Sequence, residues 1–223
     1  MKSRFLALIA GLATVAVTLP AVALEPGDFI LRGGAGLIVP LDDSDSLTGL
    51  PGATVDVDDA VTFAFTAGYM VTQHFAVELL GIWPANHDVD GDGILPGLGI
   101  SDVGDLDVFP PTLSINYYFQ PKERFRPHIG FGVNATWYWD VEASGQTKAV
   151  LGQATDLNIE SSVGWAANIG FDYDINDRFF ATAGLWYVDM DADASLETTA
   201  LGELDVDIDV NPLVALIGIG VRF

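Results

Sequence analysis

Residues 210–223 at the end of the chain read VNPLVALIGIGVRF, and this stretch decides the fold. Counted in twos back from the last residue, one face of an extended strand carries only apolar side chains: Leu213, Ala215, Ile217, Ile219 and Val221. The other face is mixed and partly polar: Val214, Leu216, Gly218, Gly220 and Arg222. One wholly apolar face opposite a narrow, partly polar face is typical of the wall of a transmembrane β-barrel.

The same alternation recurs in seven further segments, at residues 28–39, 61–71, 75–83, 112–119, 128–139, 163–173 and 179–189. In these segments large aliphatic and aromatic side chains form the outward set, and glycine or short polar side chains form most of the inward set. A soluble sandwich would not usually repeat this design so often. We therefore predict an all-β protein, an eight-stranded antiparallel transmembrane β-barrel.

The connections between these segments predict the orientation of the barrel. Three are short turns, at residues 70–75, 119–127 and 174–179, and four are long, at residues 40–60, 84–111, 140–162 and 190–211. The long connections hold most of the acidic residues and only Lys148 among the basic ones. Outer-membrane barrels have short periplasmic turns and long extracellular loops, and we expect the same here.

The N-terminus resembles an export signal. It reads MKSRFLALIAGLATVAVTLPAVALEPGD, in which Lys2 and Arg4 precede an apolar run and Ala21-Val22-Ala23 fits a small-x-small cleavage site. We predict a signal peptide at residues 1–23 and the outer-membrane barrel at residues 24–223. An N-terminal membrane helix is disfavoured, because Pro20 and an acidic segment follow the apolar run where a basic flank would be expected.

The amino-acid composition limits the classes of binding partner and the cellular compartment that suit this protein. There are 31 acidic residues against 9 Lys and Arg, a formal net charge of −22, which excludes nucleic acid as a partner. The chain has no cysteine, so an exported protein must be stabilised by something other than disulfides, such as a closed barrel. Half of the residues are hydrophobic, yet nothing after the N-terminus offers the roughly 20 continuous apolar residues of a spanning helix. We expect the lipid of the bacterial outer membrane as a partner, and no cofactor.

Several stretches resemble the OmpW and AlkL group of small outer-membrane proteins. They are FILRGGAGLIVP (29–40), AVELLGIWPANH (76–87), FPPTLSINYYF (109–119), RPHIGFGVNATWYW (126–139), WAANIGFDYDINDRFFATAGLWYVDMDADA (165–194) and DVDIDVNPLVALIGIGVRF (205–223). The resemblance covers essentially the whole chain after the signal. It implies an eight-stranded barrel whose hydrophobic lumen passes small apolar molecules and releases them sideways into the bilayer. It carries over no gating residue.

The inward side chains of eight strands nearly fill the lumen, which disfavours a wide aqueous pore. We expect the inward apolar residues to line a path for small apolar solutes: Leu80, Ile82, Trp186, Val214 and Leu216. We expect the inward ionisable residues to form a structural network: Arg32, Glu78, Asp172 and Arg222. The main alternative is a non-transporting structural, adhesion or stress barrel that acts through its acidic loops. A soluble lipocalin-like carrier is disfavoured by the outward aromatic residues.

Prolines mark candidate gaps in the barrel wall. Five of them fall at the loop-side ends of predicted strands: Pro40, Pro84, Pro110, Pro111 and Pro212. Proline cannot donate to a sheet ladder, so we expect incomplete pairing between the third and fourth strands and between the eighth and first. A solute could leave sideways through such a gap. The alternative is that these prolines only end strands, which is their usual place.

Residues 87–93, HDVDGDG, begin like a calcium-binding EF-hand loop, with Asp88, Asp90 and Asp92 at its first, third and fifth positions. The twelfth position is Gly99 where a glutamate is needed, and no flanking helices are readable. A solvated loop is favoured, and weak binding of divalent cations by these acids is the alternative. Two rows of aspartates, 189–193 and 205–209, alternate as on a strand, so that each should repel itself and attract screening cations.

No catalytic constellation is readable in the sequence. The histidines are His74, His87 and His128, and none has a serine or carboxylate partner at motif spacing. We therefore predict that the protein is not an enzyme.

Overall fold

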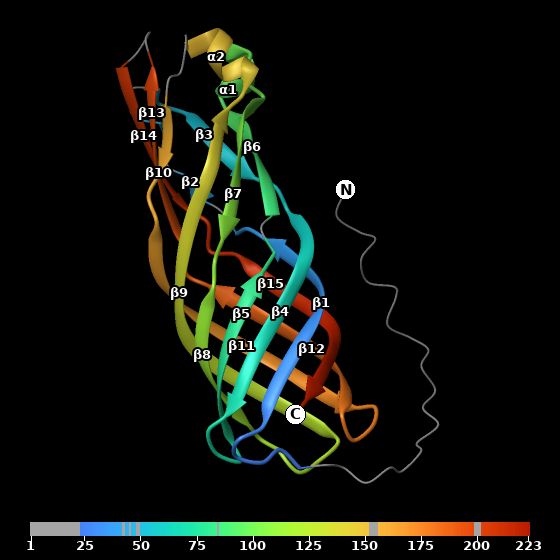
Figure 1. Ribbon diagram of the computed structural model, residues 1–223. Helices are drawn as coiled ribbons and strands as arrows, with labels where there is room; N and C mark the ends of the chain where they lie inside the picture. The colour runs from blue at the N-terminus through green and yellow to red at the C-terminus, as the bar shows by residue number, and fades with distance from the viewer. Residues whose placement is uncertain are drawn as a thin grey trace.

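The computed structural model describes residues 23–41, 43–44, 46–47, 50–83, 85–151, 156–198 and 202–223. In this part of the chain, eight strands close into one antiparallel barrel, which confirms the predicted fold class (Figure 1). In order around the wall they are β1 (Phe29–Val39), β4 (Ala60–Met70), β5 (Phe75–Ile82), β8 (Thr112–Tyr118), β9 (Phe125–Ala143), β11 (Ser162–Asp174), β12 (Phe179–Val188) and β15 (Leu213–Arg222). The last strand pairs with the first.

The two faces of the wall follow the predicted alternation. Ile217 of β15 is 71% exposed on the outside, whereas the next residue toward the N-terminus, Leu216, is fully buried inside. Large apolar side chains cover the outer face on every strand, among them Phe63, Leu79, Ile115, Phe131, Ile169 and Leu185. An outer surface of this kind would be unstable in water and is what a bilayer requires.

The closure between β1 and β15 depends on glycine. Their ladder runs without a break from the pair Ile30 and Arg222 to the pair Val39 and Leu213. Midway, a Cβ atom on Gly34 would lie 2.2 Å from the carbonyl oxygen of Ile217, so any larger residue would push the strands apart. Glycine at this position therefore permits the close approach that seals the barrel.

The long connections, which we expected to be extracellular loops, contain further strands. They contain β2 (Asp43–Ser44), β3 (Ala53–Val57), β6 (Ala85–Gly93), β7 (Asp102–Phe109), β10 (Asp156–Ile159), β13 (Asp191–Thr198) and β14 (Gly202–Asp209), with two short helices, α1 (Leu95–Leu98) and α2 (Gly145–Leu151). We call these elements, with the upper part of β9, the extension. It prolongs the barrel at the end away from the short turns (Figure 1).

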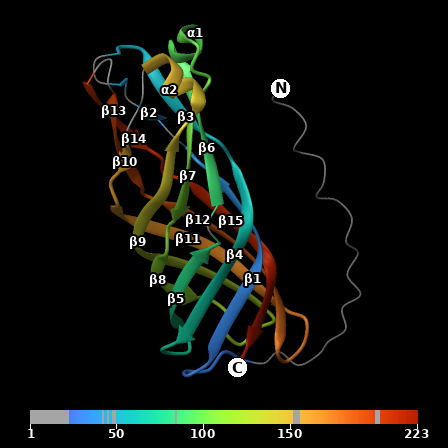
Figure 2. The ribbon, with the colours of Figure 1, turned by 45° about the horizontal axis from the view of Figure 1, so that its top comes forward.

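The extension consists of two sheets. In one, β3, β6 and β7 continue the barrel wall through β9, and in the other β10, β13, β14 and β2 pair in that order. Figure 2 shows the two sheets on different sides of the same end of the barrel. Both present apolar side chains inward, such as Val55 and Ile208, so the lumen continues upward between them. No helix of the described residues is long and apolar enough to cross a membrane.

Candidate functional site

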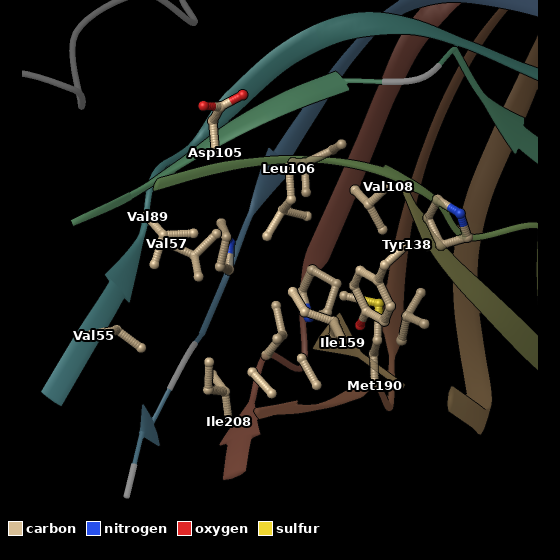
Figure 3. Close-up of a pocket in the computed structure, with 18 of the residues that line it drawn as sticks. Val55, Val57, Val89, Asp105, Leu106, Val108, Tyr138, Ile159, Met190 and Ile208 are labelled. Carbon is tan, nitrogen blue, oxygen red and sulfur yellow. The ribbon is translucent and has the colours of Figure 1, made fainter. Parts of the chain in front are cut away.

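An apolar cavity of about 110 Å³ lies where the barrel opens into the extension (Figure 3). Val55, Val108 and Ile208 from the extension line it, together with Met190 between β12 and β13. The barrel contributes Leu80, Ile82 and Val214 from the upper ends of its strands. Among the labelled residues in Figure 3, the carboxylate of Asp105 points away from the space that the apolar side chains share. The cavity therefore suits an apolar guest.

The lining follows from alternation along the strands of the extension. On β13, Asp191 and Asp193 are exposed, whereas Ala192 and Ala194 between them are buried. The one aromatic ring with a polar group in the lining, Tyr138, donates its hydroxyl to the carbonyl oxygen of Asp191 at 3.0 Å. Burial removes water from the Tyr138 hydroxyl and thereby raises its pKa, so the group remains a neutral donor at ordinary pH.

The five predicted lumen residues come together in one apolar cluster. Leu80, Ile82 and Val214 line the cavity itself. Trp186 and Leu216 are buried in the same cluster but are not among the residues that line the cavity. The indole ring of Trp186 lies against Gly184. A Cβ atom on that glycine would come within 2.5 Å of the ring, so the packing requires glycine there. These two residues therefore pack beneath the cavity.

The prolines also gather at this level. Pro40, Pro110 and Pro212 line the cavity. The carbonyl oxygen of Pro111 accepts hydrogen bonds from the backbone N–H of Ala135 at 3.2 Å and from Nδ2 of Asn134 at 3.2 Å. Pro84 lies outside the described residues.

The seam between β1 and β15 is less open than predicted. Pro40 and Pro212 interrupt its ladder above the pair Val39 and Leu213. Immediately above them, the N–H of Leu41 donates to the carbonyl oxygen of Val210 at 2.9 Å, and β2 then pairs with β14. The gap at this seam is therefore no wider than the prolines themselves.

The seam between β5 and β8 is interrupted over a longer stretch. Its ladder ends at the pair Leu80 and Thr112, and pairing resumes between β6 and β7 at Ala85 and Val108. Among the described residues, no backbone hydrogen bond joins 81–83 to 109–111. The N–H of Trp83 faces the neighbouring strand β4 and donates to the carbonyl oxygen of Phe63 at 2.8 Å. The wall is thus unpaired where Ile82 and Pro110 line the cavity.

Below the apolar cluster, the lumen is closed by a network centred on Arg32. Its guanidinium donates to both carboxylate oxygens of Asp172 at 2.9 and 2.8 Å, to the hydroxyl of Tyr118 at 2.7 Å and to Oγ1 of Thr66 at 3.1 Å. It also pairs with Glu78. The partners come from four other strands, so one side chain ties together opposite walls of the barrel.

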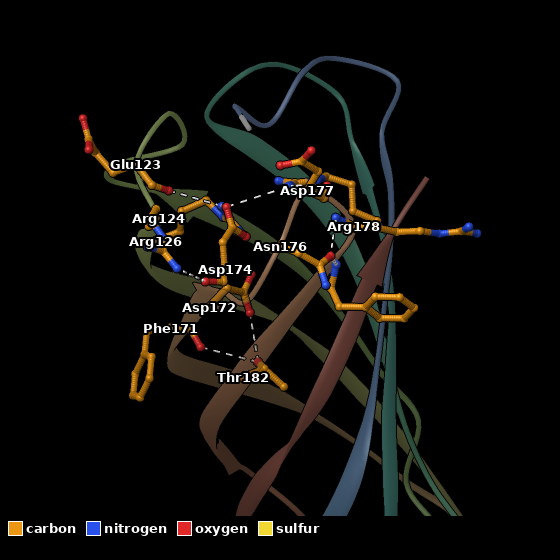
Figure 4. Close-up of polar contacts among 12 residues, drawn as sticks. Glu123, Arg124, Arg126, Phe171, Asp172, Asp174, Asn176, Asp177, Arg178 and Thr182 are labelled. Carbon is orange, nitrogen blue, oxygen red and sulfur yellow. Dashed lines mark hydrogen bonds and ion pairs between the residues drawn. The ribbon is translucent and has the colours of Figure 1, made fainter. Parts of the chain in front are cut away.

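A second cluster lies nearer the short turns. Arg126 donates to Asp174 at 2.6 Å (Figure 4). Arg222 lies 3.8 Å from the same carboxylate. The ring of Phe180 contacts both clusters. The guanidinium carbons of Arg32 and Arg126 lie 5.6 and 5.7 Å from the centroid of this ring. The predicted network thus falls into two parts, with Arg222 in the second.

Sequence reasoning missed Arg126, Asp174 and Tyr118. The first two have the inward parity but lie just outside the predicted segments 128–139 and 163–173, whereas β9 begins at Phe125 and β11 ends at Asp174. Together the two clusters hold three arginines and three carboxylates, all nearly buried: Arg32, Arg126 and Arg222 with Glu78, Asp172 and Asp174. Their charges cancel, which explains how a low-dielectric lumen tolerates them.

The acidic residues of the extension form cross-strand rows rather than a calcium loop. Asp88, Asp90 and Asp92 lie on β6, so the loop expected there is a strand. Asp90 faces Asp56 on one side and Asp102 on the other. Loss of hydration, then the nearby carboxylates, raise the pKa of Asp90. In the described residues, no group of three His, Asp or Glu side chains is arranged to hold a metal ion.

Two of the histidines, His74 and His128, contact Tyr118 of the barrel wall. Nδ1 of His74 lies 2.8 Å from the carbonyl oxygen of Tyr118. The ring of His128 packs on the ring of Tyr118, with 4.9 Å between centroids. The side chain of His87 lies outside the described residues.

Comparisons with known proteins agree with this architecture. The model of the OmpW family matches residues 25–223. The chain is 35% identical to outer membrane protein W of Vibrio cholerae, over 96% of this chain and 98% of that protein. It is 28% identical to the dibenzothiophene metabolism operon protein PahQ of Pseudomonas aeruginosa, over 78% of this chain and 77% of that protein. The crystal structure of the outer membrane protein OprG from Pseudomonas aeruginosa superposes with a TM-score of 0.84 at 33% identity, over 90% of this chain and 98% of that chain. The chain therefore belongs to the OmpW family and is a β-barrel of the bacterial outer membrane.

Proposed function

We propose that the protein gives small apolar molecules a passive route from the cell exterior into the outer membrane. The solute enters the cavity from the extension and leaves sideways between β5 and β8 into the bilayer. The observation that carries this proposal is the meeting of two features at one place. The apolar cavity reaches the wall at Ile82 and Pro110, and there 81–83 and 109–111 share no backbone hydrogen bond in the described structure.

The charged clusters make the straight route through the barrel unfavourable. A solute moving down from the cavity would have to part Arg32 from Glu78 and Asp172. Separating a buried ion pair costs about 3–5 kcal/mol, because each charge is left uncompensated. The lipid outside offers an apolar solute a favourable environment at about 25 cal/mol per Å² of surface removed from water. Sideways release is therefore the path of lower free energy.

One relative supports the class of solute. The protein PahQ, 28% identical to this chain, is named for a dibenzothiophene metabolism operon. Dibenzothiophene is an aromatic molecule without a charged or hydrogen-bond-donating group. The lining of the cavity described above suits a guest of that kind.

The test measures uptake of a panel of apolar solutes by cells with and without the protein, and then closes the seam. The chain has no cysteine, so Trp83→Cys with Phe109→Cys introduces a single pair across the gap. A matched pair, Leu79→Cys with Leu113→Cys, lies across the same two strands where the ladder is intact. Oxidation should slow uptake in the first variant and leave the second unchanged, and a reductant should restore the rate.

Equal uptake with and without the protein would contradict the proposal. It would favour the alternative of a non-transporting barrel that acts through its acidic exterior. If uptake depends on the protein but does not change when the seam disulfide forms, the proposed transport stands and the proposed sideways exit between β5 and β8 is ruled out.

A further inference from the structure

Directly below the cavity, three buried side chains leave hydrogen-bonding groups unused. They are Nε1 of Trp186, Oδ1 of Asn168 and Nδ2 of Asn116, and none of these atoms has a partner in the structure. Buried donors and acceptors are nearly always paired, because leaving them unpaired sacrifices their hydration without replacement. Together these atoms are two donor groups and one acceptor that the protein itself does not satisfy.

The register of the barrel places the three side chains in one row. Trp186 lies opposite Val214, which lines the cavity, and opposite Asn168 on its other side. Asn168 lies opposite Gly130, which in turn lies opposite Asn116. The row therefore begins beside Val214 of the cavity wall with Trp186 and continues around the barrel to Asn168 and Asn116. We call these three residues the polar ledge.

Gly130 allows the two amides to meet. Nδ2 of Asn168 donates to Oδ1 of Asn116 at 3.0 Å across this glycine, and a Cβ atom there would lie 1.7 Å from that oxygen. The bond uses one donor and one acceptor of the pair. Whichever way the amides are turned, one carbonyl oxygen and one NH₂ group of the pair are left over, and Trp186 lies opposite Asn168 in the register.

We propose that the polar ledge binds the hydroxyl group of a solute whose apolar part occupies the cavity, so that the barrel prefers alcohols to alkanes of equal chain length. A hydroxyl oxygen accepts from the N–H of Trp186 while its hydrogen is donated to Oδ1 of Asn168. A ketone satisfies only the tryptophan, and an alkane satisfies neither. A carboxylate is excluded, because it would add a negative charge above the balanced clusters of Arg32 and Arg126. This inference rests on the proposed function.

The first measurement follows the indole N–H signals of ¹⁵N-labelled protein, refolded in detergent, by NMR. The chain has five tryptophans, and Trp186→Phe identifies the signal of interest by its loss. Titration with 1-decanol should move this proton signal to higher frequency, as a new hydrogen bond does, and decane at the same concentration should not. The signal of Trp165, which is 43% exposed on the lipid face, is the internal reference.

The second measurement compares entry of 1-decanol and decane into cells that carry the wild type or a variant. Trp186→Phe keeps an aromatic ring but removes the donor, and should reduce the preference for the alcohol on the order of five- to tenfold. Asn168→Leu removes the acceptor and should act in the same direction. Trp165→Phe is the matched control and should keep the preference.

The outcomes separate the two proposals. If the wild type speeds entry of both solutes equally and the signal of Trp186 responds to both alike, the ledge has no such role, whereas apolar uptake stands. If the wild type speeds entry of neither, the proposed function fails. If Trp186→Phe does not assemble, Asn168→Leu decides, and an unchanged preference in that variant overturns the inference.

Discussion

The eight barrel strands below the cavity, which we call the lower barrel, and the extension are built from the same alternation of side chains with opposite polarity. In the lower barrel, Ile217 and Phe131 face outward and Arg32 and Asp172 lie within. In the extension, Asp193 faces outward and Ala192 and Ile208 lie within. The environment explains the inversion, since lipid requires apolar side chains on the outside and water favours charged ones. Strand geometry thus sets which face a residue takes, and height above the membrane sets what that face must be.

The largest expected effect comes from breaking the charge balance of the lower barrel. Arg32→Leu leaves Glu78 and Asp172 buried without a counter-charge, and we expect it to lower the free energy of unfolding by about 3–5 kcal/mol. Urea titration of the refolded barrel in detergent measures this. Arg178→Leu, which changes an exposed arginine in a turn, should cost less than about 1 kcal/mol.

A rescue variant tests the cause. Adding Glu78→Gln and Asp172→Asn to Arg32→Leu removes the orphaned charges and should restore part of the lost stability. If the triple variant is as unstable as Arg32→Leu alone, packing of the arginine rather than charge compensation holds the lower barrel together.

The next effect concerns the outer faces. Ile217→Arg places a charge on the lipid side of β15 and should cost about 2–4 kcal/mol if it lies near the bilayer midplane. Asp193→Arg makes the corresponding outward change in the extension, where Asp193 lies opposite Asp207. We expect that variant to be neutral or more stable, because it turns a like-charge pair into an opposite-charge pair. Equal losses in the two variants, measured by urea titration, would contradict the inversion.

The sequence predicted the lower barrel well because lipid imposes strict rules on it. Large apolar residues had to alternate with small or polar ones, and the parity read from Ile217 and Leu216 holds in the structure. The strand-like alternation of the aspartates at 189–193 and 205–209 is confirmed by β13 and β14. A run such as Asp191-Ala192-Asp193-Ala194 has no bulky residue, so the sequence did not indicate that these strands form a sheet of their own. Arg126 and Asp174 were missed because strand ends carry few apolar residues, so the segments were cut short of them.

The junction of the two regions is tested through the prolines. Pro110→Thr with Pro111→Val supplies backbone donors at the seam between β5 and β8, where 109–111 share no backbone bond with 81–83 in the described structure. We expect slower uptake of apolar solutes, by several-fold, with normal assembly judged by the mobility difference between unboiled and boiled samples in gels. Pro40→Thr is the control at the narrower seam and should change uptake less. Unchanged uptake in a well-assembled double variant would speak against an exit at this place.

The smallest effect should come from the protons and cations that reach the acidic exterior of the extension. Loss of hydration and then the neighbouring Asp209 raise the pKa of Asp191, and the pKa of Asp90 is raised in the same way. A carboxyl group whose pKa is higher in the folded state contributes stability that is fully present below its unfolded pKa of about 3.9 and is lost as pH rises through the folded value. Protection of the β13 and β14 amides from hydrogen exchange, corrected for the intrinsic rate, should therefore be greater at pH 4.5 than at pH 7.5, by roughly two- to fivefold for a cross-strand pair of like charges.

Magnesium at pH 7.5 should act in the same direction by screening the rows of aspartates. Amides of β1 and β15, whose outer faces carry apolar residues, serve as the control and should not respond. If protection in β13 and β14 falls on acidification or ignores both pH and magnesium, repulsion between the carboxylates does not limit the stability of the extension.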